Sequence, residues 1–162
     1  MKTKVTITEI TQEDLVDFLS TAFYGSNYLS ADYDEDAEIE RDDDDCYEDV
    51  MAKILLSGGA IRVTDGYAEG AVYGDLSCEV DEDGEDVTYN VTLQDIKSGL
   101  EAAANGTFNA GENDEYIPDW RDRNIEFAKR SFEAMSWNIN EWDALTADCL
   151  MQIILFDEIV YG

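Results

Sequence analysis

The chain has 162 residues, of which 39 are acidic and 10 basic, so its formal net charge at pH 7 is -29. Such an excess of carboxylates argues against binding to nucleic acid or to anionic membranes, because both need cationic surfaces on the protein. Hydrophobic residues make up 44% and aromatic residues 11% of the sequence, which excludes a disordered acidic tail and allows a packed core. We expect one domain over residues 1–162 whose partners are basic.

Two further features of the sequence limit the kinds of catalytic site, disulfide and membrane segment that the protein can have. The chain has no histidine, and its three cysteines, Cys46, Cys78 and Cys149, are widely spaced and odd in number, which does not predict a disulfide framework. No segment is apolar and long enough to span a bilayer, and the N-terminus lacks the pattern of a signal peptide. We therefore expect a cytoplasmic protein.

The first predicted element is a strand at residues 2–8, where polar residues alternate with apolar or β-branched ones. Thr11 and Asp14 then form a variant of the capping box, which predicts a helix at residues 12–23. The acidic stretch that follows is predicted to be a loop. A second, amphipathic helix is predicted at residues 46–57, because a pair of glycines ends its apolar pattern.

The middle of the chain predicts three strands. Residues 60–64 form the first, and residues 76–80 and 87–91 form a pair. Between the two strands of the pair, Asp83-Gly84 is a strong hairpin signal, because both residue types accept the left-handed backbone of a tight turn. An antiparallel connection is therefore expected there.

Three helices are predicted in the rest of the chain, at residues 93–104, 120–135 and 141–157. The last of them is apolar on almost every side, so it should be the central buried helix. Asp157 and Glu158 would stand in its final turn, where the helix dipole disfavours negative charge. Either this helix ends near Phe156 and a short terminal strand or an extended tail follows, or a Lys or Arg side chain pairs with the two carboxylates. We favour the first alternative.

The predicted fold class is α+β, with a small antiparallel sheet covered by about five helices in a single domain. Apolar periodicity also selects the side chains that should form the core. They are Phe18, Ile54, Leu55, Leu100, Phe127, Leu150, Ile153 and Ile154.

The acidic stretch at residues 32–49, DYDEDAEIERDDDDCYED, is the strongest anomaly of the sequence. It contains twelve acidic residues and one base, Arg41. Folding alone does not favour so many like charges side by side, because they repel one another in the compact state. The stretch is therefore a solvated loop, a cation site or a surface whose function is to be negative.

A calcium site is one alternative for this stretch. Asp32-x-Asp34-x-Asp36 begins like an EF-hand loop, but Ala37 stands where the sharp turn of such a loop needs glycine. A second near-match at residues 79–90 is better explained by the hairpin turn. We expect no specific metal site and no cofactor.

Catalysis is another alternative. The sequence offers no histidine, no serine-nucleophile motif and no phosphate-binding glycine loop. Aspartates around Cys46 raise the pKa of its thiol and oppose a nucleophilic role. A hydrolase built on two carboxylates would need one of them buried, which the sequence does not indicate. We expect a protein that is not an enzyme.

A surface of carboxylates suits a partner that normally binds DNA. B-DNA carries one negative charge for about every 1.7 Å of helix axis, and rows of carboxylates can occupy the same basic cleft. In size, charge, absence of histidine and mixed α+β pattern, the chain resembles the DNA-mimic proteins of phages and conjugative elements, such as anti-restriction and anti-CRISPR inhibitors. The segment TADCLMQIILFDEIVYG at residues 146–162 is also similar to the ending of small uncharacterised mobile-element proteins of gut bacteria.

The first resemblance implies an inhibitor that binds a basic DNA-binding protein of the host, a defence nuclease or a CRISPR effector. The rival hypothesis is a structural or regulatory mobile-element protein whose charge is incidental. Carboxylates would steer the encounter and tyrosines would anchor the complex. The residues expected to bind the partner are Asp32, Asp34, Glu35, Asp36, Glu38, Glu40, Asp42, Asp43, Asp44, Asp45, Glu48 and Asp49, then Asp81, Glu82, Asp83 and Glu85, and the tyrosines Tyr28, Tyr33 and Tyr47. The sequence leaves the oligomeric state open.

Overall fold

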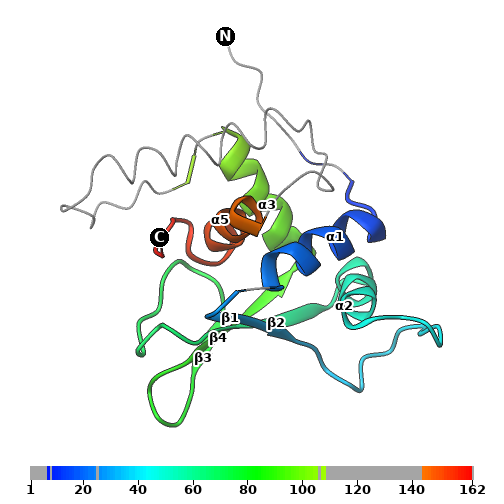
Figure 1. Ribbon diagram of the computed structural model, residues 1–162, viewed down its shortest axis with the longest axis horizontal. Helices are drawn as coiled ribbons and strands as arrows, with labels where there is room; N and C mark the ends of the chain where they lie inside the picture. The colour runs from blue at the N-terminus through cyan, green and yellow to red at the C-terminus, as the bar shows by residue number, and fades with distance from the viewer. Residues whose placement is uncertain (1–6, 8, 25, 106, 109–143, 162) are drawn as a thin grey trace.

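Four strands pair in one antiparallel sheet and four helices lie against it in the part of the chain that the computed structural model describes (Figure 1). That part comprises residues 7, 9–24, 26–105, 107–108 and 144–161. The strands are β1 (Leu29–Asp32), β2 (Ala60–Asp65), β3 (Cys78–Val80) and β4 (Val87–Thr92), and the helices are α1 (Gln12–Phe23), α2 (Tyr47–Leu56), α3 (Leu93–Asn105) and α5 (Ala144–Phe156).

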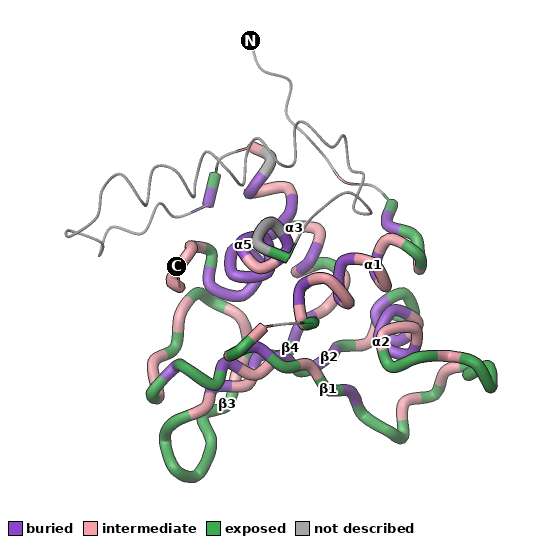
Figure 2. Tube along the Cα trace, viewed as in Figure 1, coloured by how far each residue is buried: buried purple, intermediate pink, exposed green. Residues whose placement is uncertain are grey.

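The sheet has one buried face and one open face. Its strand order is β1-β2-β4-β3, and every neighbouring pair is antiparallel. Buried and exposed side chains alternate along β2 and β4, because successive residues of a strand point to opposite faces. Ile61 and Val63 of β2 and Tyr89 and Val91 of β4 are fully buried. The described helices all lie over this buried face, and the core lies between the two layers (Figure 2).

Helix α5 lies in the middle of the helical layer, packed against both α1 and α3 (Figure 1). Every side chain from Leu150 to Phe156 is buried, as the apolar sequence of this helix predicted. Helix α3 approaches it closely at Gly99, where an added Cβ would lie 2.7 Å from the Cα of Ile154. A side chain at this position would have to push the two helices apart.

The sequence predicted most of these elements. The first helix begins with the expected capping box, in which Thr11 Oγ1 accepts a 3.1 Å hydrogen bond from the Asp14 N–H and Asp14 Oδ2 accepts a 3.2 Å bond from the Thr11 N–H. The hairpin between β3 and β4 is also confirmed, and Gly84 in its turn has the left-handed φ of 72°. Helix α5 ends at Phe156, as expected, and Asp157 leaves it with a φ of 57°.

Two predictions need correction. The sequence predicted no strand where β1 lies, because LSAD has a single large apolar residue and no run of alternation. Pairing with β2 stabilises this strand instead. The described residues contain four helices rather than about five, and the predicted helix at residues 120–135 lies outside them. The predicted strand at residues 2–8 falls outside them too, except for residue 7, which is not in a strand.

The predicted core is confirmed wherever the structure describes it. Seven of the eight side chains named from the sequence are buried, and the eighth, Phe127, lies outside the described residues. Among the described helices, none combines the length and the apolar character needed to cross a membrane.

Candidate functional site

The acidic loop, residues 33–46, connects β1 to α2, and Arg62 of β2 attaches its beginning to the sheet. Arg62 Nη2 lies 3.1 Å from Asp32 Oδ2 and donates a further hydrogen bond of 3.1 Å to the Tyr33 carbonyl. Asp32 Oδ1 accepts hydrogen bonds of 2.8 Å from the Tyr47 hydroxyl and from the Tyr33 N–H. These bonds, with that from Tyr47 the strongest cause, lower the pKa of Asp32.

Lys53 of α2 holds the far end of the acidic loop. Its ammonium lies 2.6 Å from Asp45 Oδ2 and 3.4 Å from Asp42 Oδ2, and it donates a 3.1 Å hydrogen bond to the Glu40 carbonyl. The side chain of Asp45 is 10% exposed, whereas that of Asp42 is 76% exposed. The hydrogen bond from Lys53 lowers the pKa of Asp45, and the same contact raises the pKa of Lys53.

Arg41 fixes the middle of the acidic loop. Its guanidinium donates to the Glu35 carbonyl at 3.1 Å, pairs with the Glu35 carboxylate at 3.5 Å, and lies 5.4 Å from the centre of the Tyr33 ring. Tyr33 is buried and packs on Tyr47, with ring centres 4.7 Å apart. Burial, followed by the bond to Asp32, raises the pKa of Tyr47 to about 12.

The basic side chains near the acidic loop hold its backbone in place. Of the four basic residues in the described part of the chain, Arg41, Lys53 and Arg62 all bind the acidic loop or the residue before it. Within the described residues, five exposed or half-exposed carboxylates of the loop have no hydrogen bond or ion pair through their side chains. They are Asp36, Glu38, Glu40, Asp43 and Asp44.

The other acidic residues predicted near the loop have local roles. Asp34 Oδ1 accepts a 2.9 Å hydrogen bond from the Asp36 N–H, which shapes a turn. Asp49 and Cys46 form a capping box at the start of α2, with the Cys46 N–H 3.0 Å and the Cys46 thiol 3.1 Å from Asp49 Oδ2. The thiol bond lowers the pKa of Asp49 and raises that of Cys46. Glu48 is half-buried in the first turn of α2.

The second predicted acidic group lies in the turn between β3 and β4. Asp81 Oδ1 accepts a 2.8 Å hydrogen bond from the Glu85 N–H, and the Asp81 carbonyl accepts one of 3.0 Å from the Gly84 N–H. These bonds stabilise the turn. Asp81, Glu82, Asp83 and Glu85 are all exposed, as expected.

The register of the sheet separates the two acidic groups. Leu29, Asp65, Val87 and Val80 stand in one row across the four strands, and the hairpin turn leaves from that row at Val80. The acidic loop leaves from Asp32, three residues further along β1 and three strands away. Strands about 4.8 Å apart that rise about 3.3 Å per residue place these two points roughly 17 Å apart. Both acidic groups project away from α1, α3 and α5 (Figure 1).

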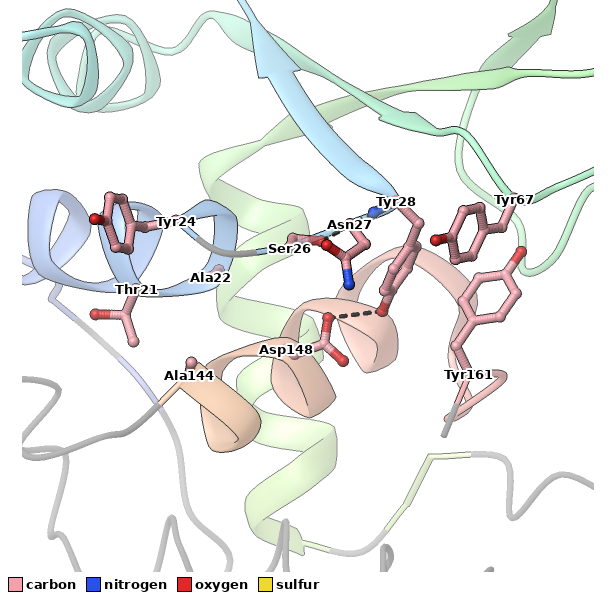
Figure 3. A pocket seen from close by; sticks show the side chains of 10 residues that line it. All are labelled: Thr21, Ala22, Tyr24, Ser26, Asn27, Tyr28, Tyr67, Ala144, Asp148 and Tyr161. Atoms are coloured by element: carbon pink, nitrogen blue, oxygen red, sulfur yellow. Dashed lines mark hydrogen bonds between the residues drawn. The ribbon is translucent and has the colours of Figure 1, made fainter.

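Tyr28 lies apart from the acidic loop, in a pocket that sequence analysis missed. Its hydroxyl donates a 2.6 Å hydrogen bond to Asp148 Oδ1 of α5 (Figure 3). One side of its ring contacts Tyr67, stacked at 5.4 Å, and Tyr161, edge-on at 4.7 Å. Burial, followed by the bond to Asp148, raises the pKa of Tyr28. No sequence motif brings these residues together, since they lie up to 133 positions apart (161 − 28).

A buried polar network supports the pocket from behind. The Gln152 side chain accepts hydrogen bonds of 2.8 Å from the Val160 and Tyr161 N–H groups, and its amide nitrogen donates to the Tyr161 carbonyl at 3.1 Å and to Asp148 Oδ2 at 2.9 Å. Asp65, also fully buried, accepts a 2.7 Å bond from the Tyr161 hydroxyl. The chain after α5 is therefore fixed against the sheet.

The near-match to an EF-hand does not bring its carboxylates together. Both oxygens of Asp32 are occupied by Tyr33, Tyr47 and Arg62. In the described ranges, no group of three or more acidic or cysteine side chains is placed to hold a metal ion. No family model, no curated protein and no solved structure matches the chain.

Proposed function

We propose that this protein is a non-catalytic inhibitor that binds the basic DNA-binding surface of another protein, such as a host defence nuclease or a CRISPR effector, and occupies the place of DNA. The observation that carries the proposal is the fixed acidic loop. Three cations bind its backbone, its inner carboxylates or the carboxylate of Asp32 just before it, and within the described residues five exposed carboxylates of the loop have no side-chain partner.

Fixing the loop favours binding for a physical reason. A flexible acidic segment loses conformational entropy when a partner orders it, whereas a loop already held by Arg41, Lys53 and Arg62 loses less. Its free carboxylates also make a local negative potential that increases the rate of encounter with a basic surface. A charge retained only for solubility does not require this preorganisation.

The second acidic group extends the same surface. The two groups start roughly 17 Å apart, by the strand spacing and rise given above. That separation equals about five base-pair steps of B-DNA at 3.4 Å each, so one basic cleft can contact both groups. Between them lies the open face of the sheet, where Ser30, Thr64, Thr88 and Glu79 stand in one polar row.

Among the tyrosines predicted as anchors, Tyr47 suits the role best. Its side chain is 42% exposed at the edge of the acidic loop. Tyr33 is 7% exposed and Tyr28 contributes to the pocket, so neither offers comparable ring surface to a partner on this side. We therefore propose Tyr47, the free loop carboxylates and the hairpin carboxylates as the contact residues.

The proposal is tested by capture from a bacterial lysate with two variants of equal charge. Asp43→Asn/Asp44→Asn removes two free loop carboxylates, and Glu69→Gln/Asp75→Asn removes two exposed carboxylates outside both acidic groups. The wild type should retain basic DNA-binding proteins at low salt and release them at high salt. The loop variant should bind the retained protein roughly threefold to tenfold more weakly, and the control variant should match the wild type. Equal weakening by both variants would support incidental charge instead.

A further inference from the structure

The pocket beside Tyr28 has a lining of unusual chemistry. It encloses about 320 Å³ between the end of α1, the start of β1, α5 and the C-terminal segment (Figure 3). Four tyrosines, Tyr24, Tyr28, Tyr67 and Tyr161, line it together with one carboxylate, Asp148. The remaining lining residues are small or uncharged. This volume is at the lower end of the range of small-molecule sites.

The charge of the pocket is negative and unbalanced. Among the described residues that line it, Asp148 is the one carboxylic acid and none is basic. Within the described residues, Asp148 accepts hydrogen bonds from Tyr28 and Gln152 but forms no ion pair. An adjoining hollow shares Thr21 and Tyr24 with the pocket and adds a second carboxylate, Glu48.

The aromatic rings favour the same kind of ligand. The face of a tyrosine ring carries partial negative charge, so it attracts a cation placed within about 6 Å of its centre. Tyr67 and Tyr161 lie on one side of the Tyr28 ring, and Asn27 lies on the other, toward Tyr24 (Figure 3). Tyr24 is 87% exposed and Tyr67 is 55% exposed, so large apolar ring area meets water at this pocket.

We propose that this pocket binds an organic cation, a guanidinium or alkylammonium group, with its charge against Asp148 and its apolar part against Tyr24 and Tyr28. The carboxylate of Asp148 complements the positive charge of the ligand, and the tyrosine rings replace water around its alkyl groups. A metal ion has no alkyl groups, so the aromatic lining favours an organic cation over a metal ion. The cation comes from a free small molecule or from an arginine or lysine side chain of a protein. The proposal does not depend on the acidic loop.

The test is titration of the isolated protein, followed by NMR of its backbone amides, with three probes at constant ionic strength. Choline represents a free ammonium ligand, N-acetyl-arginine amide represents a protein side chain, and 3,3-dimethylbutanol is the uncharged analogue of choline. At least one cation should shift the amides of Tyr28, Asp148 and Tyr161 in a saturable way, and the uncharged analogue should not. The cation that binds more tightly identifies the source.

Three variants make the test specific. Asp148→Asn keeps an acceptor for the Tyr28 hydroxyl and should weaken binding about tenfold, because the charge complement is lost. Tyr24→Ala changes an exposed side chain that the fold does not need, and it should weaken binding about threefold. Asp43→Asn removes a carboxylate of the acidic loop and should have no effect. Equal affinity in the wild type and Tyr24→Ala, equal weakening by Asp43→Asn, or shifts confined to the acidic loop would overturn the proposal.

Discussion

The Lys53 ammonium lies 2.6 Å from Asp45 Oδ2, and this contact joins α2 to the far end of the acidic loop. A single cation thus holds the turn of four consecutive aspartates, because it also reaches Asp42 and the Glu40 carbonyl. The contacts of Lys53 therefore hold the shape of a loop whose carboxylates otherwise repel one another.

Replacing Lys53 by glutamine should therefore release the loop. The variant should unfold at a lower temperature than the wild type, and a glutamate-specific protease should cleave it faster at Glu35, Glu38 and Glu40. The control is Lys97→Gln in α3, which changes the net charge by the same amount away from the loop. Equal cleavage of the two variants would show that Lys53 does not hold the loop.

Gly99→Ala tests the close approach of α3 to α5. Alanine favours helix by about 1 kcal/mol relative to glycine, but its Cβ would overlap Ile154. Overpacking costs about 1–3 kcal/mol, and an added Cβ 2.7 Å from the Ile154 Cα places this site in the upper part of that range. After the gain in helix propensity is subtracted, the free energy of unfolding should fall by roughly 1–2 kcal/mol. Urea unfolding measures this, with the exposed neighbour Ser98→Ala as control. A variant as stable as the wild type would mean that the helices are further apart.

Gln152→Met tests the buried network at the end of the chain. Methionine fills a similar volume but leaves the Val160 and Tyr161 N–H groups without their acceptor. An unsatisfied group costs about 1–3 kcal/mol when it is fully buried, and these two N–H groups are partly buried. The loss of unfolding free energy should therefore lie in the lower part of the summed range, at about 2–4 kcal/mol. Hydrogen exchange at these two amides should also become faster. Gln94→Met, at an exposed position of α3, should change neither quantity.

The pH dependence of stability should have a maximum below neutrality. Asp32, Asp45 and Asp49 have pKa values lowered by Tyr47, Lys53 and Cys46 respectively, so they add stability above about pH 4 that is lost as pH falls through their folded-state values. Burial raises the pKa of Glu158, which has the opposite effect. Self-repulsion also weakens as carboxylates are protonated.

Urea unfolding across pH measures the balance of these effects. Stability should rise as pH falls from about 8 to about 5, and it should decrease below about pH 4. In Asp45→Asn, the decrease at low pH should be smaller. Stability that falls steadily from pH 8 to 5 would contradict this account of the charges.

The sequence predicted the elements whose signals are local. The capping box at Thr11, the turn at Gly84 and the end of α5 before Asp157 each depend on neighbouring residues, and each is confirmed. Strand β1 was missed because its structure comes from pairing with β2. The paired residues lie 30 positions apart at Asp32 and Arg62 and 36 positions apart at Leu29 and Asp65.

The candidate sites also contain features that neighbouring residues indicate and features that only distant contacts in the fold produce. The acidic residues of the loop and hairpin were evident in the sequence because they are contiguous. The role of Arg62 was not evident, since Arg62 reaches Asp32 across 30 positions. The pocket joins Tyr28 to Asp148 across 120 positions, and only the fold brings them together.

The measurement that tests the central proposal most directly is competition with DNA. A basic protein captured at low salt is mixed with a fluorescent duplex that it binds, and the complex is titrated with the wild-type chain while fluorescence anisotropy is recorded. The duplex should be released in full, the midpoint should rise in proportion to the duplex concentration, and Asp43→Asn/Asp44→Asn should require more protein. A ternary complex in which the chain and the duplex are bound together would contradict the proposal that the acidic surface takes the place of DNA.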